Sequence, residues 1–311
     1  MTPRSSRGSA ADALHAGESA IVQVVDLEAA EHSWEVRRGV VVHGYAFNSQ
    51  VPGPTIEAAV GDTLVVRFSN QTPQPIAIDW DGLPEPMSDA EEPAANPVRR
   101  GGAIEYRFRL PSSGTFWYHP QVQPTDPLEP HGLYGVLIAK GPDEPGLDGD
   151  RVLVIGEMQA ALFRQPPSPV PIEMDVHGPR GYVILVNGAS QPKMGIAAGD
   201  RERWRLINAT KGRNLRLSLE GRPFAVMTNQ SGLPTSTVEV HEVLMRPAER
   251  LELVVGPFAA EETVLLNALP PRGSGGSAGQ HRLATFQVWP AGRPRGVSSA
   301  IRSFPLTPFQ S

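Results

Sequence analysis

Two carboxylates one residue apart, Asp79 and Asp81, are the first residues of the sequence whose spacing could support chemistry. They lie in IDWDGL (78–83), which has the pattern of a short strand. Side chains at i and i+2 of a strand point to the same side, so the carboxylates should share one face, with Trp80 on the other. Such a pair can bind a metal ion, can act as a general acid and base once one pKa is raised, or can lie hydrated at an exposed edge.

Short alternating runs that turn residues separate must position this pair. The chain of 311 residues contains 31 glycines and 32 prolines, a share that favours many turns and short strands. Runs such as WEVRRGVVVHGYAF, TLVVRFSN, IAIDW and TFWYHP precede GPDEPGLDGD (141–150), and runs such as RVLVIGEM and RERWRLINAT follow it. The pattern predicts an all-β protein.

The segment GPDEPGLDGD has the composition of a linker and divides the chain in two. We therefore predict a disordered tail over 1–20, a first β domain over 21–142, a linker over 143–150, a second β domain over 151–291 and a C-terminal tail over 292–311. The length of the chain suits two domains of about 150 residues each.

An internal repeat supports this division. PTIEAAVGDTLVVRFSNQT (54–72) aligns with PKMGIAAGDRERWRLINAT (192–210), with matching proline, Gly-Asp, arginine, asparagine and threonine positions. The repeat predicts two copies of one supersecondary unit, and about seven short strands in each copy make a β-sandwich the simplest fold.

Four segments carry a resemblance to a known family: YAFNSQVPGPTIEAAVGDTLVVRFSNQT, IDWDGL, GTFWYHPQVQ and HGLYGVLIAKGP. In order and spacing they resemble the first cupredoxin domain of the multicopper oxidases, the family of the laccases. ERWRLINA and RLSLEGRPF resemble the second domain of that family. The resemblance covers residues 35–291 and implies two tandem cupredoxin-type Greek-key β-sandwiches.

The same resemblance assigns four copper-binding histidines to positions 79, 81, 119 and 121. Here Asp79, Asp81 and Gln121 replace three of them, and only His119 keeps the family residue. The family's blue copper also needs a cysteine thiolate, and the chain has no cysteine. No counterpart of the family's third domain, which supplies the other copper ligands, follows the second. The resemblance therefore implies a degenerate copper site, no copper cofactor and no laccase activity.

Three functions remain open from the sequence. The first is a binding or scaffold protein, for which a copper-free bacterial cell-division protein of the same family is a precedent. The second is an enzyme in which Asp79, Asp81 and His119 form an acid–base set, or bind a non-copper divalent metal with Gln121 as a fourth position. The third is an oxidase half-site that a partner chain completes. In the first case the aspartates are hydrated polar residues on a former ligand face.

Charge and hydropathy limit the partners and the compartment. The net charge is −5, and no cluster of Lys and Arg with aromatic residues suggests nucleic-acid binding. No run approaches the roughly 18 apolar residues of a membrane span. The N-terminus lacks the apolar core of a signal peptide, so the sequence as written predicts a cytoplasmic protein, exported if a leader has been trimmed. We expect a homo-oligomer, such as the trimer of two-domain laccases, or a protein partner over the uncovered face of the first domain.

Overall fold

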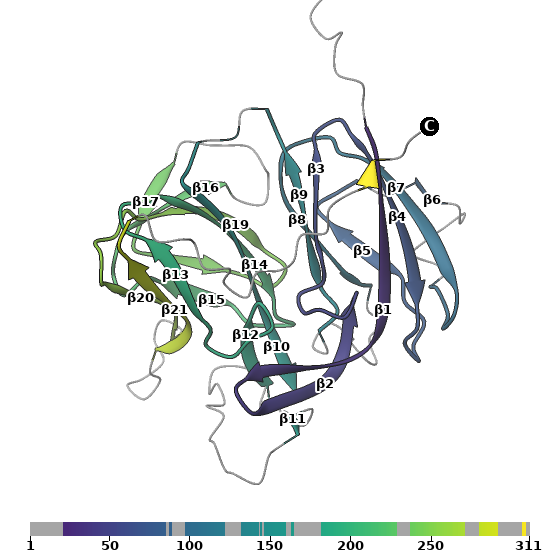
Figure 1. The fold of residues 1–311 in the computed structure, drawn as a ribbon, viewed down its shortest axis with the longest axis horizontal. Helices are drawn as coiled ribbons and strands as arrows, with labels where there is room; N and C mark the ends of the chain where they lie inside the picture. The colour runs from purple at the N-terminus through teal and green to yellow at the C-terminus, as the bar shows by residue number, and fades with distance from the viewer. Residues whose placement is uncertain are drawn as a thin grey trace, which may run out of the picture.

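A computed structural model describes residues 21–84, 87–88, 97–121, 132–142, 144, 146–159, 163–164, 182–228, 237–270, 280–291 and 307–308. The predicted tail over 1–20 lies outside these ranges. Every regular element in the described residues is a β-strand, which confirms the all-β prediction (Figure 1). No helix long and apolar enough to cross a membrane occurs in these ranges.

The first half of the chain forms a sandwich of two sheets. Its strands are β1 (Val22–Arg37), β2 (Val40–Phe47), β3 (Thr55–Ala59), β4 (Thr63–Asn70), β5 (Ile78–Asp81), β6 (Met87–Ser88), β7 (Ala103–Arg109), β8 (Gly114–Pro120) and β9 (Gly135–Lys140). One sheet contains β2-β1-β4-β7-β6, and the other has the order β3-β9-β8-β5. We call this sandwich domain 1. The strand β5, which carries the two carboxylates, lies at an edge.

The second half forms a second sandwich, domain 2. Its strands are β10 (Gly149–Gln159), β12 (Tyr182–Val186), β13 (Lys193–Ala197), β14 (Glu202–Ala209), β15 (Leu215–Ser218), β16 (Phe224–Thr228), β17 (Val238–Val240), β18 (Glu242–Met245), β19 (Arg250–Val255), β20 (Thr263–Leu269) and β21 (His281–Trp289). The sheets have the orders β12-β10-β14-β19-β16-β17 and β13-β21-β20-β15-β18. Both sandwiches are of the predicted cupredoxin type.

Two details differ from the predicted segmentation. The strand β10 begins at Gly149 and pairs in parallel with β14, so the last two residues of the predicted linker, Gly149 and Asp150, belong to a sheet. Two short strands from later in the chain join the larger sheet of domain 1: β11 (Phe163–Arg164) pairs with β2, and β22 (Thr307–Pro308), from the predicted C-terminal tail, pairs with β1. Backbone pairing therefore crosses the boundary that composition suggests.

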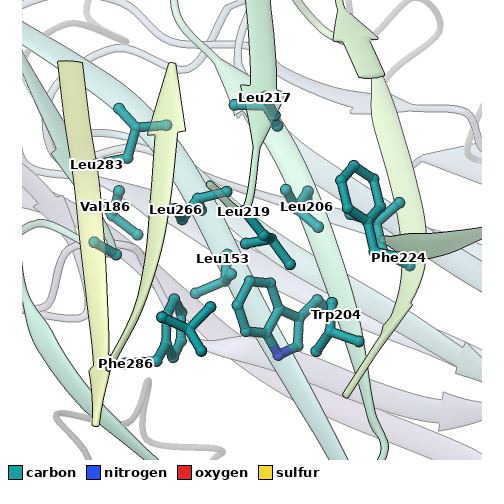
Figure 2. Close-up of a cluster of buried hydrophobic side chains, with 14 of the residues drawn as sticks. Leu153, Val186, Trp204, Leu206, Leu217, Leu219, Phe224, Leu266, Leu283 and Phe286 are labelled. Atoms are coloured by element: carbon teal, nitrogen blue, oxygen red, sulfur yellow. The ribbon is translucent and has the colours of Figure 1, made fainter. Parts of the chain in front are cut away.

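Each sandwich encloses its own apolar core. In domain 1, Trp80, Phe68 and Tyr118 are among the side chains between the two sheets. In domain 2, Trp204 stacks on Phe286 with ring centroids 4.2 Å apart, and leucines from both sheets surround them (Figure 2). Alternation along each strand places these residues inward, as the period of two in the sequence predicts.

The internal repeat is visible at the level of single hydrogen bonds. β4 pairs in parallel with β1, as β14 does with β10. At the end of β4 the hydroxyl of Thr72 donates to Asn70 Oδ1 at 2.7 Å, and after β14 the hydroxyl of Thr210 donates to Asn208 Oδ1 at the same distance. The two halves are copies of one unit.

Two apolar clusters join the domains. One packs Val36, Val40 and Val42 of the β1–β2 hairpin against Met158, Val183 and Leu185 of β10 and β12. The other packs Trp117, Tyr134, Val136 and Ile138 of domain 1 against Val154, Ile207 and Ala209 of domain 2. The outer face of the β3-β9-β8-β5 sheet is thus partly covered by domain 2, and this is the face on which the predicted site lies.

Candidate functional site

The strands β5 and β8 bring the predicted site residues together. They pair antiparallel, with Asp79 opposite His119 and Asp81 opposite Trp117. Because side chains alternate, these four residues share the outer face, while Trp80 and Tyr118 point into the domain core. The prediction that Asp79 and Asp81 lie on one face is confirmed.

Asp79 and His119 face one another at the outer end of this pair of strands. Asp79 Oδ2 lies 3.8 Å from His119 Nε2, with 51% of the aspartate side chain exposed and 12% of the histidine side chain. The imidazole stacks on Trp117 with ring centroids 4.1 Å apart, and its Nδ1 lies 3.1 Å from the carbonyl oxygen of Pro120. The stacking fixes the plane of the ring beside an accessible carboxylate.

Asp81 has a different partner, from the other domain. Arg250, the first residue of β19, places Nη2 3.5 Å from Asp81 Oδ1, and its Nη1 donates to the backbone carbonyl oxygen of Asp81 at 2.7 Å. Gly82 follows with φ +85°, and a Cβ there would collide with the guanidinium. The chain therefore turns sharply beneath the arginine where only glycine leaves room.

Arg250 is buried, with 8% of the residue exposed. Burial lowers the pKa of its guanidinium, and the charge of Asp81 acts in the opposite direction. The guanidinium carbon lies 5.5 Å from the centroid of the Phe116 ring, a cation–π distance. Nε has no hydrogen-bond partner among the described residues. Asp81 is thus the main compensation for a buried cation.

The fourth predicted position, Gln121, directly follows β8 and is exposed. Its backbone N–H donates to the carbonyl oxygen of Ala77 at 2.7 Å, which ties the end of β8 to the start of β5. Nothing in this contact brings the amide side chain toward the aspartates.

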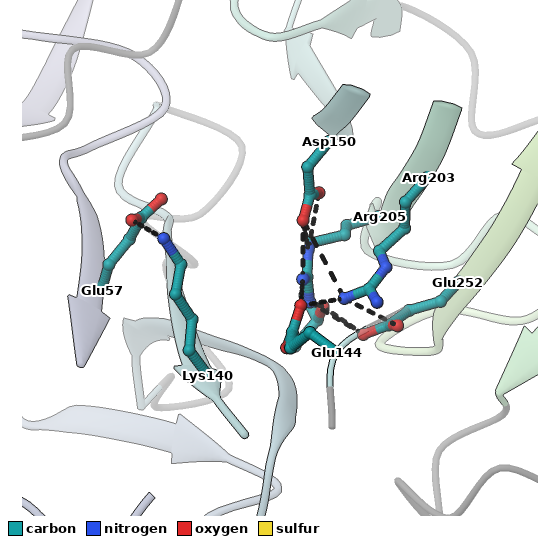
Figure 3. A network of polar contacts seen from close by, with 8 residues as sticks. Glu57, Lys140, Glu144, Asp150, Arg203, Arg205 and Glu252 are labelled. Atoms are coloured by element: carbon teal, nitrogen blue, oxygen red, sulfur yellow. Dashed lines mark hydrogen bonds and ion pairs between the residues drawn. The ribbon is translucent and has the colours of Figure 1, made fainter. Parts of the chain in front are cut away.

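A network of charges joins the same two domains next to this site (Figure 3). Arg205, which is fully buried, donates from Nε to Asp150 at 2.8 Å and from Nη1 to Glu252 at 3.0 Å and to the hydroxyl of Thr115 at 2.9 Å. Thr115 itself donates to Glu252 at 2.7 Å. One hydroxyl of β8 therefore connects domain 1 to two charged strands of domain 2.

The network also contains Arg203 and Glu144, 2.6 Å apart. Burial works to lower the pKa of Arg205, but its hydrogen bond with Asp150 and the charges of Glu252, Asp150 and Glu144 outweigh burial and raise it. Arg205 is thus well compensated, whereas Asp81 is the one carboxylate that pairs with Arg250 among the described residues.

Sequence reasoning did not identify Arg250 or this network. The two strands ERWRLINA and RLELVV each carry charges two residues apart, Arg203 and Arg205 in the first and Arg250 and Glu252 in the second, and the structure buries both strands along their whole length. Charged residues in a strand normally predict a face exposed to solvent, so the sequence pattern does not indicate that another layer covers these side chains.

Comparison with known proteins shows similarity to the multicopper oxidases. The sequence profile of the family described as multicopper oxidase matches residues 28–144. The solved structure of a multi-copper oxidase from Pseudomonas thermotolerans superposes with a TM-score of 0.72 and 26% identity, over 94% of this chain and 68% of that one. Residues 28–144 therefore match the multicopper oxidase family, and the chain as a whole is similar in fold to a solved member of that family.

Two curated relatives illustrate the range of this family. The multicopper oxidase MmcO of Mycobacterium tuberculosis is 28% identical over 248 residues, which cover 70% of this chain and 48% of the relative. The cell division protein FtsP of Proteus mirabilis is 28% identical over 235 residues, which cover 71% and 48%. The chain spans about half the length of these relatives.

The residues at the family's ligand positions do not fit copper. Carboxylate and amide oxygens stand where imidazoles are expected, and imidazole is the ligand that suits copper. Asp81 is engaged by a cation of the protein. Within the described ranges, no group of three or more His, Cys, Asp or Glu side chains is placed to hold a metal ion.

Of the other histidines, His131 and His177 lie outside the described residues. His241 is exposed, and its Nδ1 lies 2.7 Å from the carbonyl oxygen of Gly221. His281 opens β21 opposite Ala268. Neither of these two residues of domain 2 lies in the strands that form the candidate site.

Proposed function

We propose that this multicopper-oxidase homologue is a binding or scaffold protein without laccase chemistry. The observation that carries the proposal is the ion pair of Arg250 with Asp81, 3.5 Å between Nη2 and Oδ1. A side chain that neutralises a buried guanidinium is not available as a ligand, because its removal from the pair would leave a charge buried without compensation. The absence of cysteine in the sequence supports the same conclusion for a blue copper site.

Copper reconstitution tests the chemical half of the proposal. The purified chain is incubated with Cu²⁺, desalted, and measured for copper content, for its electron paramagnetic resonance spectrum and for oxidation of a phenolic substrate. We expect no stoichiometric copper and no oxidation, because the ligands are oxygen-rich and one is paired with a cation. Stoichiometric copper with substrate oxidation would contradict the proposal and support an oxidase half-site that a second copy of this chain completes.

The binding half of the proposal concerns the surface around Asp79, more than half of whose side chain is exposed. Separately, on domain 2, the edge strands β17 and β18 carry two exposed apolar side chains, Val238 and Leu244, at 55% and 51% exposure. Exposed apolar side chains on edge strands are suited to contact with another chain. We propose a homo-oligomer or a protein partner, and light scattering over a range of concentrations distinguishes the first from a monomer.

A monomer at all concentrations, together with no partner recovered by cross-linking and affinity purification of the full chain, would contradict a binding role. Variants with Val238→Ser and Leu244→Ser report whether the edge strands contribute, because exposed positions tolerate such changes with little effect on stability.

A second candidate function rests on Asp79 and His119, which face one another at 3.8 Å. A carboxylate beside an imidazole can act as an acid–base pair, or bind a divalent ion weakly. Titration with Mn²⁺, Fe²⁺ and Zn²⁺ tests it. Stoichiometric binding that His119→Ala abolishes would support the enzyme, whereas no binding at micromolar metal would leave only the acid–base pair, which Asp79→Asn then tests.

A further inference from the structure

The two aspartates that replace histidines have unlike surroundings. Asp79 is more than half exposed and faces His119, whereas the side chain of Asp81 is 28% exposed and pairs with Arg250. Both stand on one face of the same strand. Domain 2 causes this difference, because Arg250 of β19 contacts Asp81, whereas Asp79 faces His119 of domain 1.

The local backbone is shaped around the arginine. Arg250 Nη1 donates a hydrogen bond to the carbonyl oxygen of Asp81 at 2.7 Å. Gly82 leaves room for the guanidinium because it has no Cβ. The conformation of the turn that ends β5 therefore depends on the arginine at the start of β19. A metal ion bound by a side chain at position 81 would lie about 2 Å from its ligand atom and hence close to this fixed cation.

Two positive charges so close repel one another strongly when water is largely excluded. The opposite change is also unfavourable: a histidine at position 81 would remove the carboxylate that, among the described residues, pairs with the buried guanidinium. The identities of residues 81 and 250 are thus linked, so that a metal ligand at one excludes an arginine at the other.

We infer that Arg250 is the metal-excluding residue of this site: its guanidinium supplies the positive charge that Asp81 now binds, and it fastens β5 to domain 2. The inference rests on the proposed function at one point, that the wild-type positions hold no copper. It adds that histidines placed at these positions bind copper more weakly while Arg250 is present.

A double-mutant cycle tests the fastening without reference to metal. Asp81→Asn and Arg250→Gln should each lower the Tm of the full chain by roughly 4 °C or more, and the double variant should lie within about 2 °C of Arg250→Gln alone. Asp79→Asn, on the same face of the same strand, is the matched control and should change Tm by less than about 1 °C. Additive effects of the two substitutions on Tm would contradict the claim that the Asp81–Arg250 pair holds β5 to domain 2.

Copper titration tests the exclusion. The variant with Asp79→His, Asp81→His and Gln121→His is titrated with Cu²⁺ by calorimetry, with Arg250 intact and with Arg250→Gln. We expect binding at least about tenfold tighter in the second background. Arg222→Gln, which removes a positive charge of domain 2 that is paired with Glu262, is the control and should leave the affinity unchanged.

Equal affinity in the two backgrounds, or no binding in either, overturns the exclusion by Arg250. Circular dichroism and Tm of each variant establish that it is folded, and a fold lost with histidine at 81 but regained with Arg250→Gln supports the same linkage. The wild-type chain in the same titration tests the proposed function separately, because stoichiometric copper there would contradict that proposal whatever the variants do.

Discussion

Asp81 has a role in the structure, as the partner of Arg250, that its position in the sequence does not indicate. The spacing of Asp79 and Asp81 places both carboxylates on one face, and β5 confirms this. What sequence could not provide is the neighbour of each, because Arg250 is 169 residues away and comes from the other domain. A contact between distant segments leaves no local pattern, so one aspartate becomes a counter-ion while the other stays accessible.

Gly82 provides a prediction at the scale of one residue. Gly82→Ala should destabilise the chain by about 2 kcal/mol or more, because a non-glycine residue at positive φ costs about 1–2 kcal/mol and the Cβ must also displace Arg250. Urea unfolding measures the change in free energy. Gly61→Ala, at φ +91° with no described atom within 4 Å of the added Cβ, isolates the backbone cost. Equal effects of the two substitutions would show that Gly82 does not make room for the arginine.

His32 provides a prediction about pH. Its partial burial, beside Trp34 with ring centroids 6.1 Å apart, lowers its pKa from 6.5. The unfolded chain therefore binds the proton more tightly, so this contribution to stability is fully present above pH 6.5 and is lost as pH falls below 6.5 toward the folded pKa. His32→Gln should flatten the fall in Tm over this range. His241→Gln, which removes an exposed imidazole, is the control, and an unchanged slope in His32→Gln would refute the assignment.

At the scale of elements, the repeat was the most informative feature of the sequence. It predicted two sandwiches, and the matching Asn–Thr hydrogen bonds after β4 and β14 show how faithful the copies are. The matching arginines, Arg67 and Arg205, show what the repeat could not predict, which is the burial of equivalent side chains. Arg67 of β4 has 54% of its side chain exposed, whereas Arg205 of β14 has 0%. The same position is at the surface in one copy and inside the domain interface in the other, because only β14 has its outer face covered by the other domain.

The strand β8 offers a prediction about that interface. Thr115→Val removes the hydroxyl that bonds both Glu252 and Arg205, and we expect a loss of about 1–3 kcal/mol in the free energy of unfolding, because buried charged groups lose a partner. Thr55→Val is the matched control in the same sheet. The Thr55 hydroxyl is buried and bonds no other described residue, so its removal should be neutral or stabilising. A neutral Thr115→Val would mean that the network does not depend on domain 1.

At the scale of the whole molecule, two apolar clusters and the charge network join the domains, and short strands from later in the chain pair with the larger sheet of domain 1. The length and composition of the chain gave the number of domains but not their coupling, because a linker-like composition says nothing about which surfaces meet. We expect the two sandwiches to unfold together in one calorimetric transition.

Adjacent residues of β14 test this coupling. Ile207 packs between the domains and Leu206 packs in the core of domain 2, and both are fully buried. Each substitution by alanine should cost about 2–5 kcal/mol. Leu206→Ala should move a single transition, whereas Ile207→Ala should separate the unfolding of the domains and raise the ratio of calorimetric to van't Hoff enthalpy. An unchanged ratio in Ile207→Ala would contradict coupling through this cluster.

The pairing of β11 with β2 and of β22 with β1 also bears on how the chain matures during synthesis. Domain 1 emerges from the ribosome first, yet one edge of its sheet is completed by Phe163–Arg164 and another stretch by Thr307–Pro308. The strand edges of newly synthesised domain 1 therefore stay unpaired until these later residues have been synthesised. Open edges are sites of aggregation, so the interval in which the nascent protein most needs chaperones lasts until Thr307 and Pro308 have been synthesised.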